Sequence, residues 1–127
     1  MIGYVTLGSN DLERAIAFYD GLLAGLGAKQ ILNDGRMVMW ARERGPGMLA
    51  VCRPWDESAA SVGNGVMVAL DAGARDAVDR LHAKALELGA ADAGAPGPRG
   101  NKGFYGGYFR DLDGNKLCAF CVGSRVP

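Results

Sequence analysis

An internal repeat is the feature that most constrains the fold of this 127-residue chain. The tripeptide Leu-Gly-Ala occurs at residues 26–28 and again at residues 88–90. In front of each copy, apolar residues recur at helical spacing and at matching positions. Residues 4–7 correspond in the same way to residues 67–70, and residues 49–51 to residues 117–119. A chain that repeats its pattern in this way is expected to fold as two similar units.

Each repeat has the pattern of a strand, a helix and three further strands. The β-branched, alternating residues 2–8 predict a first strand, and the apolar stripe from Leu12 to Leu26 predicts a helix. Asn10 and Glu13 resemble a capping box at the start of that helix. We therefore predict one α+β domain over residues 1–127, built from two tandem βαβββ modules. The modules span about 1–53 and 65–122, and a polar connector covers 54–64.

The closing stretch of the chain, residues 104–122, reads as a β-hairpin. Its turn is Asp111-Leu112-Asp113-Gly114-Asn115, and Gly and Asn accept the positive φ that a tight reversal needs. In the connector, Trp55 is expected to pack on the core rather than to form a pocket rim.

A trough between the two modules is expected from strand alternation. The helix of a βαβββ unit covers one face of its sheet, so two units can form a curved mixed sheet around a central trough, with the helices outside. Val5, Leu7, Leu49, Val51, Val68, Leu70, Leu117 and Ala119 should face the helices. Tyr4, Thr6, Ala50, Cys52, Met67, Ala69, Cys118 and Phe120 should face the trough. Such an apolar trough is typical of a small-molecule pocket, although the same side chains would also fill a closed barrel.

Charge and composition exclude several classes of partner. The 14 basic and 14 acidic residues balance, and no basic tract occurs, so neither nucleic acid nor a membrane surface is an expected partner. The chain has no apolar run of the roughly 20 residues that a membrane span needs, and its first residues lack the pattern of a secretory signal. Three cysteines argue against a disulfide framework and for a reducing, cytoplasmic location.

Two segments together resemble the vicinal-oxygen-chelate superfamily, also called the glyoxalase/bleomycin resistance protein/dioxygenase family. The segment VTLGSNDLERAIAFYDGLL is similar to the family's first strand and helix. The segment FRDLDGNKLCAF is similar to its closing hairpin, with Leu112 where proline is common. The resemblance covers nearly the whole chain and implies the duplicated βαβββ fold and, often, a homodimer.

The resemblance also implies four metal-ligand positions, which many members of the family fill with His, Glu or Gln. These positions fall on Tyr4, Ala50, Met67 and Cys118, none of which is a usual ligand type for a hard divalent cation. We therefore expect no metal cofactor. Cys118, Met67 and Tyr4 also form a soft donor set that would suit copper(I) or zinc, but an adaptable apolar lining is the simpler interpretation.

The remaining reactive or charged residues give weaker indications. His82, the only histidine, is expected on the helix side, away from the trough. No cation is evident on the face of Cys118, so we expect an inert thiol. Arg99 and Lys102 would form either a lid for an anionic ligand or a solvated loop. Tyr105 and Tyr108 must lie on opposite faces of their strand, and only the pairing register decides which one faces the trough.

The function predicted from these features is metal-independent binding of an apolar or aromatic small molecule, as the resemblance to drug-sequestering members implies. The candidate ligand-binding residues are Tyr4, Trp40, Met67, Tyr108 and Cys118, and no catalytic residue is assigned. Trp40 is included as a possible wall of the trough. One alternative is a glyoxalase-like lyase or isomerase, or a dioxygenase, with a non-standard metal site. Another is a partner-binding dimer whose trough is filled.

Overall fold

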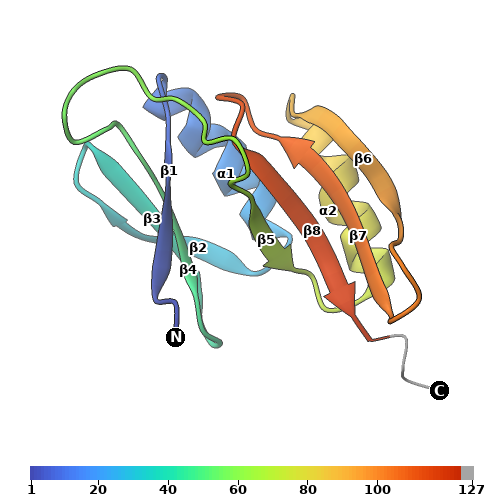
Figure 1. Cartoon of the computed structure of the whole chain (residues 1–127). Coiled ribbons are helices and arrows are strands. Elements are labelled where there is room, and N and C mark those ends of the chain that lie inside the picture. The colour runs from blue at the N-terminus through green and yellow to red at the C-terminus, as the bar shows by residue number, and fades with distance from the viewer. Residues whose placement is uncertain (124–127) are drawn as a thin grey trace.

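The computed structural model describes residues 1–123 and contains two modules of similar build (Figure 1). The first module consists of β1 (Tyr4–Gly8), α1 (Leu12–Ala24), β2 (Ala28–Asn33), β3 (Met37–Arg42) and β4 (Met48–Cys52). The second consists of β5 (Val68–Asp71), α2 (Arg75–Glu87), β6 (Ala91–Pro98), β7 (Phe104–Arg110) and β8 (Lys116–Val122). The predicted α+β class and the order of elements in both βαβββ modules are therefore confirmed.

Each module has its own four-stranded mixed sheet, and the two sheets have the same topology. Their strand orders are β1-β4-β3-β2 and β5-β8-β7-β6. In each sheet the first strand runs parallel to the last, and the other neighbours are antiparallel. Thr6 lies opposite Ala50 in the first sheet, as Ala69 lies opposite Cys118 in the second. The repeat in the sequence thus corresponds to a repeat in strand register.

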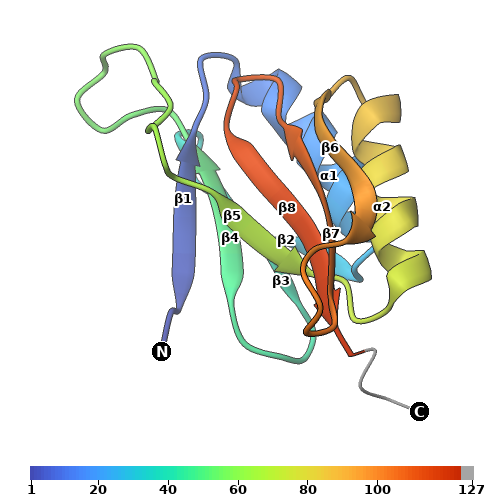
Figure 2. The same ribbon diagram turned by 45° about the vertical axis from the view of Figure 1, so that its right-hand side comes forward.

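The helices cover one face of each sheet and leave the other face open. Figures 1 and 2 show the two sheets side by side, with α1 and α2 on the same side of them. Of the side chains predicted to face the helices, Leu7, Leu49, Val51, Leu117 and Ala119 belong to the buried core. Val68 and Leu70 pack against that core, and Val5 is half-buried. Alternation along the strands therefore assigned the two faces of these strands correctly.

The start of α1 differs from the predicted capping box. Asp11, not Asn10, is the N-cap, and its carboxylate accepts a hydrogen bond from the backbone N–H of Arg14 at 3.1 Å. Asn10 instead ties down the connector, because its side chain exchanges two hydrogen bonds with the backbone of Ala60. Asn10, the residue before the N-cap, thus has a tertiary role that a local pattern does not reveal.

The turn of the closing hairpin joins the two modules. Asp111 is buried and accepts a hydrogen bond of 2.6 Å from the hydroxyl of Tyr19 on α1. The side-chain amide of Asn115 donates to the carbonyl of Gly8, at the end of β1, and to Asp111. The carboxylate of Asp113 accepts from the backbone N–H of Asn10. A turn of the second module is therefore hydrogen-bonded to the first strand and helix of the first module.

The connector runs over the surface between β4 and β5, and in it Trp55 is 82% exposed. The guanidinium of Arg36 lies 5.1 Å from the centroid of the Trp55 ring. The expectation that Trp55 packs on the core was therefore wrong, because its ring lies on the surface against Arg36. In the part of the chain that the structure describes, neither helix is long and apolar enough to cross a membrane.

Candidate functional site

The open face of the second sheet brings together two of the predicted site residues. Tyr108 on β7 lies opposite Cys118 on β8, and Cys118 lies opposite Ala69 on β5. Tyr105 is on the other face, where its hydroxyl donates a hydrogen bond of 2.7 Å to Asp79 of α2. The pairing register thus places Tyr108, and not Tyr105, on the open face.

Tyr4 and Met67 lie at corresponding places in the two modules, and both are exposed. Tyr4 begins β1 and is 53% exposed, and Met67 immediately precedes β5 and is 42% exposed. Ala50, by contrast, is fully buried between β1 and β3. In a single chain, the apolar surface at Tyr4 and Met67 is therefore exposed to solvent.

Trp40, proposed as a possible wall of the trough, lies on the side of β3 that α1 covers. It is 1% exposed, and its indole N–H donates a hydrogen bond of 2.8 Å to Asp20 of α1. Its ring is 5.8 Å from that of Tyr19, between centroids. Trp40 pairs with Leu49 and therefore shares the face that α1 covers. Alternation along β3 does not by itself say which set of residues faces the helix, so only the structure assigns Trp40 to a face.

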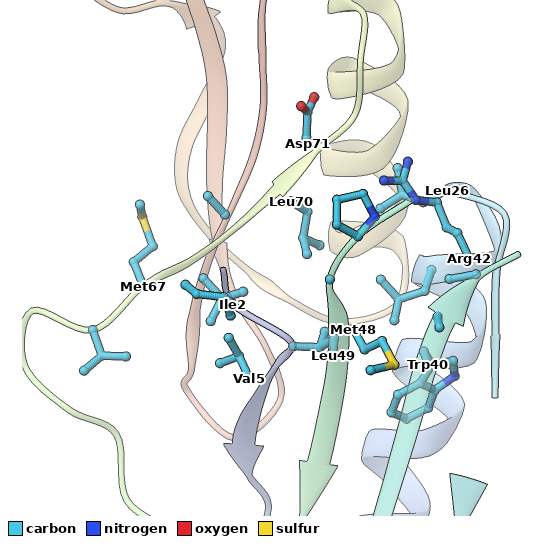
Figure 3. A pocket seen from close by; sticks show the side chains of 18 residues that line it. Ile2, Val5, Leu26, Trp40, Arg42, Met48, Leu49, Met67, Leu70 and Asp71 are labelled. Atoms are coloured by element: carbon cyan, nitrogen blue, oxygen red, sulfur yellow. The ribbon is translucent and has the colours of Figure 1, made fainter. Parts of the chain in front are cut away.

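A mainly apolar cleft of about 470 Å³ opens where β5 passes the first sheet (Figure 3). Its lining comes from both modules, and Figure 3 shows Val5, Leu49 and Leu70 around the same space. Trp40 and Met67 also line it, whereas Tyr4, Tyr108 and Cys118 do not. The charged side chains in the lining are Arg42 and Asp71. No sequence signal identified this cleft, because it depends on how the two modules are placed.

The donor set at the four implied ligand positions does not fit a divalent metal ion. Tyr4 and Ala50 lie in the first module, and Met67 and Cys118 lie in the second. None of the four side chains is an imidazole or a carboxylate. Across residues 1–123, no three His, Cys, Asp or Glu side chains are grouped so that they could hold a metal ion. No step of a reaction through a metal can be derived from these residues.

His82 is buried on the helix side of the second sheet, as expected from its place on the helix. Its Nε2 atom lies 3.2 Å from a carboxylate oxygen of Asp92 and 3.1 Å from the carbonyl oxygen of Tyr108. The backbone N–H of Gly94 and the hydrogen bond with His82 hold the pKa of Asp92 below its usual value. The imidazole therefore links α2 to β6 and β7 and does not reach the open face.

The thiol of Cys118 lies among cations that we did not expect. Burial raises its pKa above the usual value, and a hydrogen bond with Tyr108 and the charges of Arg99 and Lys116 oppose that increase. The expectation that no cation shares its face was therefore wrong. Lys116 stands two residues before Cys118 on β8, so alternation alone would have found it. Arg99 approaches through the tertiary fold.

Comparison with known proteins matches this chain to one protein family and to solved structures of the same fold. A family model described as the glyoxalase/bleomycin resistance protein/dioxygenase superfamily matches residues 1–119. A search of curated proteins gave no significant match. The chain is similar to the crystal structure of a glyoxalase/bleomycin resistance protein from Albidiferax ferrireducens T118, with 31% identity and a TM-score of 0.88. That match covers 97% of this chain and 99% of the other.

Two more distant structures share the fold. A lactoylglutathione lyase from Agrobacterium tumefaciens is 24% identical, with a TM-score of 0.68 over 94% of this chain and 92% of its own. TioX from Micromonospora sp. ML1 is 18% identical, with a TM-score of 0.66 over 97% of this chain and 99% of its own. At these identities the likeness concerns the fold alone.

Proposed function

Because the chain belongs to the glyoxalase/bleomycin resistance protein/dioxygenase superfamily, we propose that it uses this fold to bind an apolar or aromatic small molecule without a metal ion. One observation carries the proposal: the four positions implied for metal ligands hold a phenol, a methyl group, a thioether and a thiol. Of these four residues Met67 lines the cleft beside β5, which is mainly apolar, as small-molecule pockets are.

The proposal includes a homodimer in which a second copy covers the open faces. Tyr4 and Met67 on these faces, and Ile2 and Val66 beside them, are exposed in a single chain. A two-fold dimer would bury the same surface on both copies, and it would close the trough over the ligand. Tyr4, Met67 and Tyr108 remain the proposed ligand contacts on the open faces. Cys118, proposed with them, is fully buried and would meet a ligand only after neighbouring side chains move, and Trp40 would reach one only through the cleft.

The proposed location is the reducing cytoplasm. Cys52, Cys118 and Cys121 are all free thiols in the described part of the chain. Free thiols are the usual state of cysteines in that compartment.

Metal analysis combined with thermal shift tests the metal-free part of the proposal. Purified protein should contain no stoichiometric transition metal, and neither EDTA nor added nickel, zinc or manganese should move its melting temperature. A stoichiometric ion whose removal destabilises the protein would contradict the proposal. That result would favour a glyoxalase-like lyase or a dioxygenase with a non-standard site.

Binding of a neutral aromatic probe such as 2-naphthamide, measured by titration calorimetry, tests the ligand part. The probe should bind the wild type, and Met67→Lys should weaken binding about tenfold, because it places a charge on the apolar surface. Leu86→Lys is the matched control, since Leu86 is an exposed apolar residue of α2 outside the cleft lining. Equal loss of binding in both variants would count against a site at Met67.

A further inference from the structure

We propose that Arg99 and Lys116, on either side of Tyr108, form an anion-binding subsite on the open face of the second sheet. The ligand would then be an apolar or aromatic molecule that carries a carboxylate or another oxyanion group. This inference rests on the proposed small-molecule function and specifies the chemical class of the ligand.

The two cations converge on one aromatic ring. The guanidinium carbon of Arg99 and the ammonium nitrogen of Lys116 each lie 5.4 Å from the centroid of the Tyr108 ring. Lys116 is on β8 and Arg99 directly follows β6, so the two charges come from different sides of β7. The two cations are therefore no more than about 11 Å apart, and the positive charge of both acts on a group bound at the Tyr108 ring.

Backbone carbonyls and a run of small residues hold Arg99 in place. Its Nη2 donates a hydrogen bond of 2.7 Å to the carbonyl of Ala95, and its Nη1 one of 3.3 Å to that of Pro98. A Cβ on Gly97 would lie 3.1 Å from Nη1, and one on Gly94 would lie 3.6 Å from Nη2. The guanidinium thus occupies space that side chains on β6 would otherwise take. A cation held in this way loses little further conformational entropy when it binds an anion.

Neither cation is paired with a carboxylate in the part of the chain that the structure describes. Within residues 1–123, the ion pairs involve Arg14, Arg80, His82 and Lys84, and none involves Arg99 or Lys116. The hydrogen bonds of Arg99 go to neutral carbonyls, which leave its positive charge intact. Two cations that lack an ion-pair partner among residues 1–123, on a partly buried surface, favour a negatively charged ligand group.

The subsite lies beside apolar and aromatic surface. Tyr108 is opposite Cys118, and the rings of Phe104 and Phe120 stack with centroids 5.6 Å apart on the same sheet. Cys118 is also the position at which the resemblance implied a metal ligand. At this position Arg99 and Lys116 therefore supply positive charge, and the neighbouring aromatic rings could pack against the apolar part of a ligand.

A pair of matched probes tests the inference on the full-length protein. 2-Naphthoate and 2-naphthamide differ in charge and have nearly the same shape, and calorimetry gives both affinities. The wild type should bind the naphthoate about tenfold more tightly, as charge-assisted hydrogen bonds predict. The double variant Arg99→Gln with Lys116→Gln should lose this preference and still bind the naphthamide. Arg99→Lys, which keeps the charge, should retain part of the preference.

The control is Lys102→Gln, which removes an exposed charge from the neighbouring loop and should leave the preference unchanged. Equal binding of the two probes by the wild type would overturn the subsite and leave the proposed function standing. A preference that persists in the double variant would also overturn it. Binding of neither probe would overturn the subsite together with the small-molecule function.

Discussion

At the scale of single residues, Tyr19 shows how the two modules depend on one buried contact. Burial, followed by the charge of Asp111 and the hydrogen bond to it, raises the pKa of Tyr19 well above the usual 10.0. Below about pH 10 the phenol is protonated in both the folded and the unfolded chain. At higher pH it ionises first in the unfolded chain, so the stability that Tyr19 contributes is lost as the pH rises toward its folded pKa.

Tyr19→Phe should therefore change both the stability and its dependence on pH. Near pH 7 the loss of the hydrogen bond should lower the free energy of unfolding by about 1–2 kcal/mol. Between about pH 9 and pH 11 the variant should lose less stability than the wild type, because one raised pKa is absent. Urea denaturation near pH 7 and again between about pH 9 and pH 11 measures the free energy of unfolding of both proteins. Tyr4→Phe, at an exposed position, is the control and should behave like the wild type.

At the scale of elements, the closing turn acts as a joint between modules as well as a reversal of the chain. Gly114 adopts a φ of +89°, which glycine accepts without steric cost. The turn was recognisable from Asp-Gly-Asn, but the partners of Asp111 and Asn115 in the first module were not. Those partners, Tyr19 and Gly8, are about a hundred residues away along the chain.

Asn115→Ala should weaken this joint. The change removes the hydrogen bonds of the side-chain amide to Gly8 and Asp111 and leaves a carbonyl at the end of β1 without that donor. We expect the free energy of unfolding to fall by about 2 kcal/mol, measured by urea denaturation. Asn101→Ala, in the exposed loop before β7, should cost less than about 0.5 kcal/mol. Equal effects of the two changes would contradict the role of Asn115.

At the scale of the whole molecule, the uncovered faces would form the interface of the proposed dimer, and that dimer makes a direct prediction. Light scattering should give the mass of two chains for the wild type. Thr6→Arg, on the open face of β1, should give the mass of one chain, because it places a charge within the proposed interface. Glu13→Arg, on the exposed surface of α1, should remain dimeric. A monomeric wild type at micromolar concentration would exclude this assembly.

The two modules, the order of their elements and the assignment of most strand faces could be derived from the sequence by itself. These features depend on local periodicity and on a repeat, and both are properties of neighbouring residues. The interpretation that the implied metal-ligand positions fall on Tyr4, Ala50, Met67 and Cys118 also came from the sequence and stays a prediction. The position of Lys116 on the face of Cys118 likewise follows from alternation along β8.

Only the tertiary structure decided which side chains meet. In it, Trp40 lies under α1, and Tyr108 rather than Tyr105 faces the open side of the sheet. Arg99 packs against the glycines of β6, and a cleft lies beside β5. Each of these outcomes depends on strand register, on an irregular strand or on the spacing of two modules. Those quantities are set by contacts between residues far apart in the chain, and no short sequence window contains them.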